Sequence, residues 1–187
     1  MTRKSLSTAL AMTAVASILA ACSSAPMAPT VAMYDQSALP DAVKVPAGNK
    51  VAMEAVGVGK ITYECRDKKD AAGQYEWVFV GPDAALNDRS GKQMGKYFGP
   101  PATWESMDGS KFTGTQVAVS PAGAGNIPMQ LVKANPIMGA GAMSGVTYVQ
   151  RVATKGGTAP AIACDTASKG KKEVVNYQAD YIFYKGI

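Results

Sequence analysis

Alternation of apolar and polar residues with a period of two constrains the fold of this chain more than any other feature. The segment 59–65 places Ile61, Tyr63 and Cys65 on one face and polar side chains on the other. The segment 177–184 alternates in the same way. This pattern is typical of strands with one buried face. Further candidate strands are residues 51–56, 75–80, 93–98, 103–107, 111–120, 129–134 and 146–153.

Turn residues separate the candidate strands. Asp108-Gly109 is a hairpin signal because both residues tolerate positive φ, and Gly99-Pro-Pro101 marks another break. Residues 82–87 give a helical hint of one or two turns, and the Gly- and Pro-rich segment 121–145 predicts a mobile surface loop around the strand at 129–134. Short strands with frequent turns predict an all-β fold, a single antiparallel β-sandwich or barrel-like domain with long Gly/Pro-rich loops.

The N-terminus has the features of an export signal. Arg3 and Lys4 precede an apolar run from about Ala9 to Ala21, which is short for a membrane span. The run ends in Leu19-Ala-Ala-Cys22 and resembles the signal of bacterial lipoproteins, in which the cysteine is acylated and becomes the new N-terminus. We therefore expect a signal peptide over 1–21, a lipidated Cys22 and a flexible Ala/Pro/Ser tether over 22–47, and a β domain over 48–187.

The residue after the cysteine indicates where such a protein resides. Ser23 stands where an aspartate tends to retain bacterial lipoproteins in the inner membrane. The resemblance therefore implies an exported protein anchored by lipid in the cell envelope, at the outer membrane.

Cysteine usage agrees with export. The chain has three cysteines, and a lipidated Cys22 leaves Cys65 and Cys164. In an oxidising compartment these two residues favour a disulfide. The alternative is two separate buried thiols that act as small apolar residues.

Composition excludes several classes of function. The chain has no histidine, which removes His-based acid–base catalysis, Ser-His and Cys-His pairs and histidine metal sites. The net charge of +5 is not clustered, so no nucleic-acid partner is expected. The glycines of 139–145 lack the spacing of a nucleotide-binding loop. We therefore expect no metal, no cofactor and no nucleotide.

A series of short elements occurs in a fixed order along the chain. They are Ile61-Thr-Tyr63-Glu-Cys65, Trp77, Pro82-Asp-Ala-Ala-Leu86, Thr103-Trp104-Glu105, Asp108-Gly109-Ser110, Tyr148-Val-Gln150-Arg151, Cys164 and Tyr177-Gln-Ala179-Asp-Tyr181. In this order they resemble the family of secreted bacterial and fungal proteins known as domain of unknown function 3455. The resemblance covers nearly the whole chain after the tether and implies a secreted single domain, with Cys65 and Cys164 inside matching elements. It implies no activity and no catalytic residue.

Two groups of residues are candidate sites. Trp104 beside Glu105 and Asp108 suits a sugar-binding face, and the two carboxylates suit glycoside hydrolysis if they face each other. The alternative places Trp104 in the core, Glu105 on the solvated face of the same strand and Asp108 in the turn. Tyr148 with Arg151 suits stacking combined with an anion contact; the alternative for the tyrosines is core packing.

Three functions remain open on this evidence. The first is a non-catalytic envelope module that binds a saccharide polymer or a protein partner. The second is a carboxylate-dependent hydrolase acting on saccharides through Glu105 and Asp108, and the third is an accessory subunit of an outer-membrane assembly. The absence of histidine and of an assembled catalytic motif favours the first.

Overall fold

The computed structural model describes residues 34–187. The predicted signal peptide and the predicted lipidation at Cys22 lie outside the described residues. The elements are the 3-10 helix η1 (Asp41–Val43) and the strands β1 (Asn49–Asp67), β2 (Tyr75–Asn87), β3 (Gln93–Phe98), β4 (Thr103–Ser106), β5 (Lys111–Ser120), β6 (Met129–Ala134), β7 (Val146–Gly156) and β8 (Lys172–Gly186). The described residues contain no α-helix.

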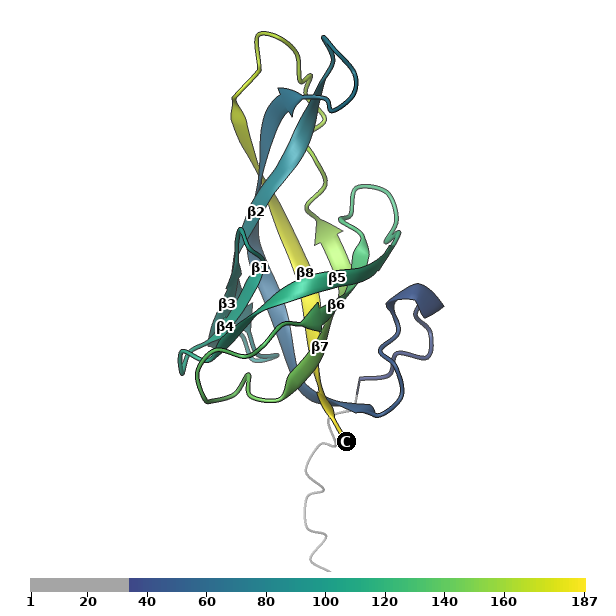
Figure 1. Ribbon diagram of the computed structural model, residues 1–187, viewed down its shortest axis with the longest axis vertical. Coiled ribbons are helices and arrows are strands. Elements are labelled where there is room, and N and C mark those ends of the chain that lie inside the picture. Colours follow the sequence, from purple (N-terminus) through teal and green to yellow (C-terminus); the bar gives the residue numbers. More distant parts are fainter. Residues whose placement is uncertain (1–33) are drawn as a thin grey trace, which may run out of the picture. The chain divides into compact units, whose positions relative to one another are not determined.

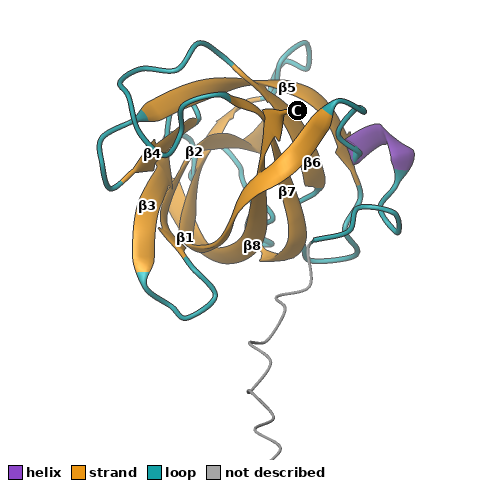
Figure 2. Cartoon of the chain, turned by 90° about the horizontal axis from the view of Figure 1, so that it is seen from below, coloured by secondary structure: helices purple, strands orange, loops and turns teal. Residues whose placement is uncertain are grey.

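The eight strands form one closed antiparallel ring. Each strand pairs with the next in the sequence, and β8 pairs with β1. Figure 1 shows the meander from the side, and Figure 2 looks into the ring. Register shifts interrupt most of the ladders, for example between Thr62 and Tyr63 and between Gln116 and Ala118. The ring is therefore less regular than an ideal barrel, and the prediction of an all-β, barrel-like domain is confirmed.

The strands β1, β2 and β8 extend past the other five (Figure 1). A disulfide between Cys65 and Cys164 ties the end of β1 to the loop that precedes β8. The same loop receives a hydrogen bond of 2.9 Å from the Trp77 indole nitrogen to the carbonyl oxygen of Ile162. The predicted disulfide is therefore present, and it acts together with other contacts of the same loop, such as the ion pair between Lys169 and Asp67 (2.7 Å) and the hydrogen bond from Gly170 N to the carbonyl oxygen of Cys65 (2.8 Å).

The helical hint at residues 82–87 is wrong, because these residues form the second half of β2. A proline is tolerated in this strand because of its place in the ladder. The carbonyl oxygen of Pro82 accepts a hydrogen bond from Gly99 N (3.2 Å). The N–H and C=O groups of a strand residue point to the same side, so the N–H that proline lacks would face the chain just beyond the end of β3. Ala84 and Leu86 then alternate inward as strand residues do.

The segment 121–145 is more ordered than the sequence predicts. Met143 is buried in the interior cluster, and Met138 forms an isolated bridge with Lys111 at the start of β5. Its many glycines and prolines shape tight turns on either side of β6. The part before β6 is held to the end of β7 by the bridge between Asn126 and Gly157, and the part after β6 lies against the start of β5, so the segment is not the mobile loop that the sequence predicts.

Two apolar clusters lie on opposite faces of the sheet. The interior cluster contains Tyr177, Ala179, Tyr181 and Phe183, the inward set that the period-two pattern of β8 predicts. The outer cluster lies where residues 34–47 cover β6, β7 and β8, with Val43 and Val45 fully or nearly buried against these strands.

Hydrogen bonds hold this N-terminal segment in place. Gln150 Nε2 donates to the carbonyl oxygen of Val43 (2.6 Å) and to Gln36 Oε1 (3.0 Å), and Gln36 in turn bonds both backbone groups of Val45. Residues 34–47, which the sequence analysis assigns to the tether, therefore pack on the outside of the ring.

Removal of the disulfide tests how much the loop before β8 depends on it. Cys65 and Cys164 are 99 residues apart, so the bond restricts a large loop of the unfolded chain. We expect Cys65→Ser to lower the free energy of unfolding by about 2–5 kcal/mol, measured by urea denaturation. Cys164→Ser should have the same effect, and the double variant should be no worse than either single one. A loss below 1 kcal/mol would contradict this account.

Candidate ligand-binding site

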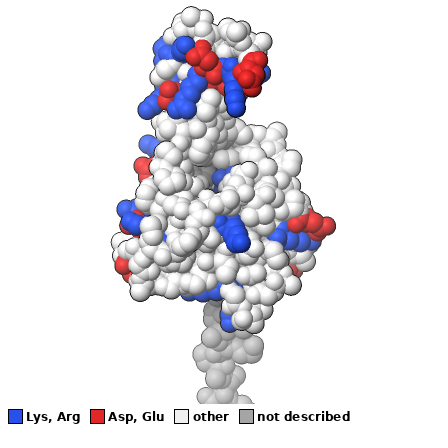
Figure 3. All heavy atoms as spheres, in the orientation of Figure 1, with Lys and Arg blue, Asp and Glu red and all other residues white. Residues whose placement is uncertain are grey.

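A cavity of about 250 Å³ opens into the interior of the ring beside β5 and β6. Figure 3 shows a hollow in this face of the molecule, with basic atoms inside it. Six strands or the loops next to them contribute to the cavity. The lining residues are Phe79, Tyr97, Ala102, Trp104, Gly114, Gln116, Ile127, Gln130, Val132 and Arg151.

The strand register places Arg151 at the cavity. Arg151 pairs with Gln130 on β6 and with Tyr181 on β8, and its position two residues after the interior Val149 turns its side chain inward. The guanidinium Nε and Nη2 both donate to the carbonyl oxygen of Pro128, at 3.1 and 3.0 Å. Arg151 is thus held at one end by β7 and at the other by the loop before β6.

The charge of Arg151 is buried without a counter-ion. The residue is only 7% exposed, and none of the ion pairs in the described part of the chain includes it. No aspartate or glutamate lines the cavity. A guanidinium has five N–H donors, and the two bonds to Pro128 leave the other three without a hydrogen-bond partner among the described residues. Burial of an uncompensated charge costs several kcal/mol, so this arrangement opposes folding.

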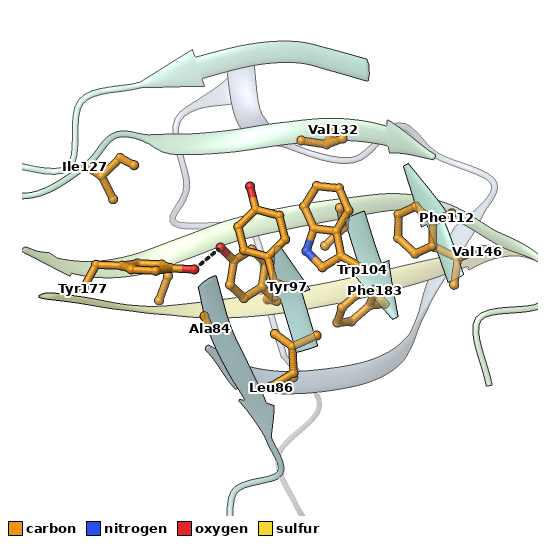
Figure 4. Close-up of a cluster of buried hydrophobic side chains, with 14 of the residues drawn as sticks. Ala84, Leu86, Tyr97, Trp104, Phe112, Ile127, Val132, Val146, Tyr177 and Phe183 are labelled. Atoms are coloured by element: carbon orange, nitrogen blue, oxygen red, sulfur yellow. Dashed lines mark hydrogen bonds between the residues drawn. The ribbon is translucent and has the colours of Figure 1, made fainter. Parts of the chain in front are cut away.

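Aromatic rings form the wall opposite Arg151. The indole of Trp104 is stacked between Tyr97 (centroids 4.6 Å apart) and Phe112 (5.3 Å). Figure 4 shows this stack, with the indole nitrogen on the side of Tyr97. The absence of a side chain at Gly114 makes room for it, because a Cβ there would lie 2.9 Å from Trp104 and 2.3 Å from Val132.

The indole nitrogen of Trp104 has no hydrogen-bond partner among the described residues, although it is buried. An unsatisfied buried donor costs about 1–3 kcal/mol. The cavity wall thus contains a second polar group whose bonding potential the described chain does not use.

Tyrosine hydroxyls add to the polar character of the interior. Tyr177 and Tyr181 share a hydrogen bond of 3.2 Å (Figure 4), and Tyr63 donates to the carbonyl oxygen of Gly157 (2.8 Å). Burial raises the pKa of Tyr97 and Tyr177, while the positive charge of Arg151 acts against that rise. The hydroxyls therefore stay protonated, and no phenolate neutralises the guanidinium.

A β-bulge in β7 follows Arg151. The register shifts between Val152 and Lys155, and Ala153 has φ 48°, a left-handed conformation that is uncommon for residues other than glycine. Bulges re-aim neighbouring side chains and are frequent next to functional sites. Here the bulge lets Thr154 turn inward and donate to the carbonyl oxygen of Ile127 (2.6 Å), which fixes a residue of the cavity wall.

The structure separates the residues that the sequence groups together. Trp104 and Arg151 both line the cavity, whereas Tyr148 packs on the outer cluster under the N-terminal segment. Trp104 is 1% exposed, so it offers no ring face to an external polymer. Gln130 and Phe79 also line the cavity, and no local sequence pattern marks them, since only the pairing of distant strands brings them there.

Glu105 lies on the outer face of β4 between two lysines. Lys96 Nζ and Lys111 Nζ each lie 3.4 Å from one of its carboxylate oxygens. Burial acts to raise the pKa of Glu105, but the hydrogen bonds and charges of the two lysines outweigh it and lower the pKa. A general acid for glycoside hydrolysis needs a raised pKa, so the surroundings of Glu105 are unsuited to that role.

Asp108 holds the turn after β4 to the loop before β7. Its carboxylate accepts from the hydroxyl and backbone N–H of Ser110 (2.6 and 2.9 Å) and from the backbone N–H of Ala142 (2.7 Å). The Ser110 hydroxyl, followed by the Ala142 and Ser110 N–H groups, lowers the pKa of Asp108 to about 2. This carboxylate therefore connects two loops and is not part of a cleft with Glu105.

Metal-binding clusters and membrane-spanning helices are absent from residues 34–187. No group of His, Cys, Asp or Glu side chains there is arranged to hold a metal ion. No helix in the same residues is long and apolar enough to cross a membrane.

Comparison with known proteins gives one match. The model of a family described as protein of unknown function (DUF3455) matches residues 46–185. No curated protein and no solved structure matches the chain.

The pKa of Asp108 predicts a pH dependence. A carboxyl whose folded-state pKa is lowered from 3.8 to about 2 stabilises the fold above its unfolded pKa, and this contribution disappears as the pH falls toward 2. We expect Asp108→Ala to lower the melting temperature at pH 7 and the difference from wild type to shrink between about pH 4 and pH 2. Thermal unfolding followed by circular dichroism measures both. A difference that stays constant down to pH 2 would be inconsistent with this role, and Glu76→Ala on the exposed face of β2 is the control.

Proposed function

Because the chain belongs to the DUF3455 family of proteins of unknown function, which supplies no activity, we propose a function from the geometry alone. The protein is a non-catalytic binding module of the cell envelope that holds a small molecule in the cavity of its ring. The observation that carries this proposal is the buried guanidinium of Arg151, which faces a cavity and has no carboxylate partner in residues 34–187.

The energetics support binding over a purely structural role for Arg151. A structural cation in a protein interior is normally paired, because a lone charge costs several kcal/mol of desolvation. A methionine would fill similar volume without that cost. A charged Arg151 beside an open cavity is explained if a ligand accepts the remaining hydrogen bonds of its guanidinium.

A small ligand suits the site better than a polymer or a protein. An external glycan chain needs an exposed aromatic face, and Trp104 lies inside the ring. The cavity of about 250 Å³ falls just below the 300–1,000 Å³ typical of drug-sized ligands. An apolar cavity of about 150 Å³ holds one benzene ring, so this one has room for a single ring with a polar substituent.

The carboxylates that a saccharide hydrolase would use do not support catalysis. Glu105 is neutralised by Lys96 and Lys111 on the outer face, and Asp108 bonds backbone groups of a loop. Both pKa values are lowered, whereas one of a pair of glycosidase carboxyls must stay protonated. These features favour a non-catalytic role.

The proposed location follows from the N-terminal sequence. An export signal that ends in Leu19-Ala-Ala-Cys22 and is followed by Ser23 supports lipid anchoring at the outer membrane. In this proposal the acylated cysteine holds the protein in the envelope, and the disulfide Cys65–Cys164 suits the oxidising conditions there.

Filling the cavity tests the binding function. In the variant Trp77→Phe, Trp104 is the one remaining tryptophan and reports on the cavity by fluorescence. We expect one-ring compounds to change this fluorescence with saturation and to protect the protein against heat. Ala102→Leu adds three carbon atoms to the lining and should abolish both effects.

A matched variant controls for general damage. Ala85 lies on β2 between the inward residues Ala84 and Leu86, so its side chain is on the outer face. Ala85→Leu should bind the same compounds as the parent. If neutral, cationic and anionic one-ring compounds all fail to bind the parent protein, the proposed function is wrong.

A substitution at the predicted lipidation site tests the anchor. We expect Cys22→Ser to move the protein from the membrane fraction to the soluble fraction, because a hydroxyl does not accept the thioether-linked lipid. Cell fractionation and mass spectrometry of the N-terminal peptide measure the result. As a control, Cys65→Ser removes a different cysteine and should leave the protein in the membrane fraction. A Cys22→Ser protein that still sediments with membranes would refute the lipid anchor.

A further inference from the structure

We infer that the ligand of the cavity is a monocarboxylate with a single planar or aromatic ring, and that Arg151 binds its carboxylate. This inference rests on the proposed function and specifies its ligand class. It is carried by the juxtaposition of one buried cation with an aromatic wall in a cavity that no acidic residue lines.

The charge of the site requires an anion. Arg151 is the one charged residue among those that line the cavity. A neutral ligand would leave the guanidinium buried and unpaired, whereas a carboxylate matches its planar fork and can accept two parallel hydrogen bonds. With Nε and one Nη2 proton committed to Pro128, the Nη1 edge of the fork is the part available to a ligand.

A single cation favours a monoanion over a phosphate. A phosphate group carries about two negative charges and three acceptor oxygens, and sites that bind it supply several cations or a row of backbone N–H groups. The cavity offers no second Lys or Arg and no helix N-terminus. One carboxylate balances the charge of Arg151.

The walls suit the apolar part of such a ligand. Phe79 presents an exposed aromatic ring, and the other apolar lining residues are buried side chains, the aromatic Tyr97 and Trp104 and the aliphatic Ile127 and Val132. The side chains of Gln116 and Gln130 bond each other across β5 and β6 (2.6 Å), which ties up part of their hydrogen-bonding capacity. A sugar ring would need more free polar partners than this wall offers.

The test compares ligands that differ in charge but little in shape. Phenylacetate, phenylacetamide and phenyl phosphate are titrated against the Trp77→Phe protein with the fluorescence of Trp104 as the signal. A charge-assisted hydrogen-bond pair discriminates by about 10- to 100-fold, so phenylacetate should bind at least 10-fold more tightly than the amide. It should also bind more tightly than the phosphate.

Substitution of Arg151 identifies the binding group. Arg151→Met keeps an unbranched side chain of similar volume and should reduce phenylacetate affinity to that of the amide, while the affinity for the amide stays the same. Its unfolding midpoint in urea should equal or exceed that of the parent, because a buried charge is removed and Pro128, which is exposed, can bond water instead.

The outcomes separate this inference from the proposed function. If the amide binds as tightly as the acid, or the phosphate binds more tightly, the ligand class is wrong while the binding function stands. If Arg151→Met retains the preference for the acid, Arg151 is not the binding group. If none of the three compounds binds and other one-ring compounds also fail, both proposals are wrong. The acid–amide comparison uses no Arg151 variant, so a misfolded Arg151→Met protein would not prevent a decision.

Discussion

The pairing of the first and last strands is the interaction on which the rest of the structure depends. β1 and β8 are hydrogen-bonded from Asn49 opposite Gly186 to Glu64 opposite Lys172. Without it the sheet would be open, with two long unpaired edges, and the inward faces of β7 and β3 would not enclose a common space. The cost is entropic, because the two strands are separated by most of the domain. The disulfide Cys65–Cys164 lies at one end of this pairing and reduces that cost.

Closure also explains how a buried charge is tolerated. A ring of eight strands has an interior just wide enough for side chains to fill, and here the filling is uneven. Near the start of β5 and β7, Phe112, Val146 and Met143 pack with Phe183. Several residues further along the same strands, Gln116 and Arg151 border a cavity instead. The apolar end supplies stability, and this allows the other end to hold Arg151 at a local cost, as binding sites commonly do.

The sequence predicts the strands better than the site, and the reason is the range of the interactions involved. The bounds of β3, β5 and β6 follow from local alternation and turn residues, so the predictions for 93–98, 111–120 and 129–134 are confirmed. The helix expected at 82–87 is wrong because Pro82 is accommodated by the position where β3 ends, a tertiary fact. The mobility predicted for 121–145 rests on its composition. In the structure Met143 packs in the interior cluster and Met138 forms a bridge with Lys111 of β5.

The candidate site shows the same limit at the level of single residues. Trp104 and Arg151 were recognised as candidates, but as parts of two different surfaces, because they lie 47 positions apart in the numbering. Their common cavity arises from two ladders, β3–β4–β5 for Trp104 and β6–β7–β8 for Arg151. No local pattern reports the register of either ladder. The alternation in β7 places Arg151 on the same face as Val149, and a charged residue on an inward face was the local signal that this face has a task other than packing.

The asymmetry of the interior further constrains how a ligand can lie. Asp108 joins the β4–β5 turn to the loop at Ala142, and Met143 of that loop is buried in the interior cluster, so this end of the ring is filled by side chains. In the proposed binding mode, a ligand would enter from the side of Gln116 and Gln130. Because Arg151 is tethered to Pro128 next to β6 and the aromatic residues belong to β3 and β4, the proposed ligand would lie with its anionic group toward β7 and its apolar part toward β3 and β4. The cation and the aromatic residues thus come from opposite sides of the ring, and only the closed ring brings them within reach of one small molecule.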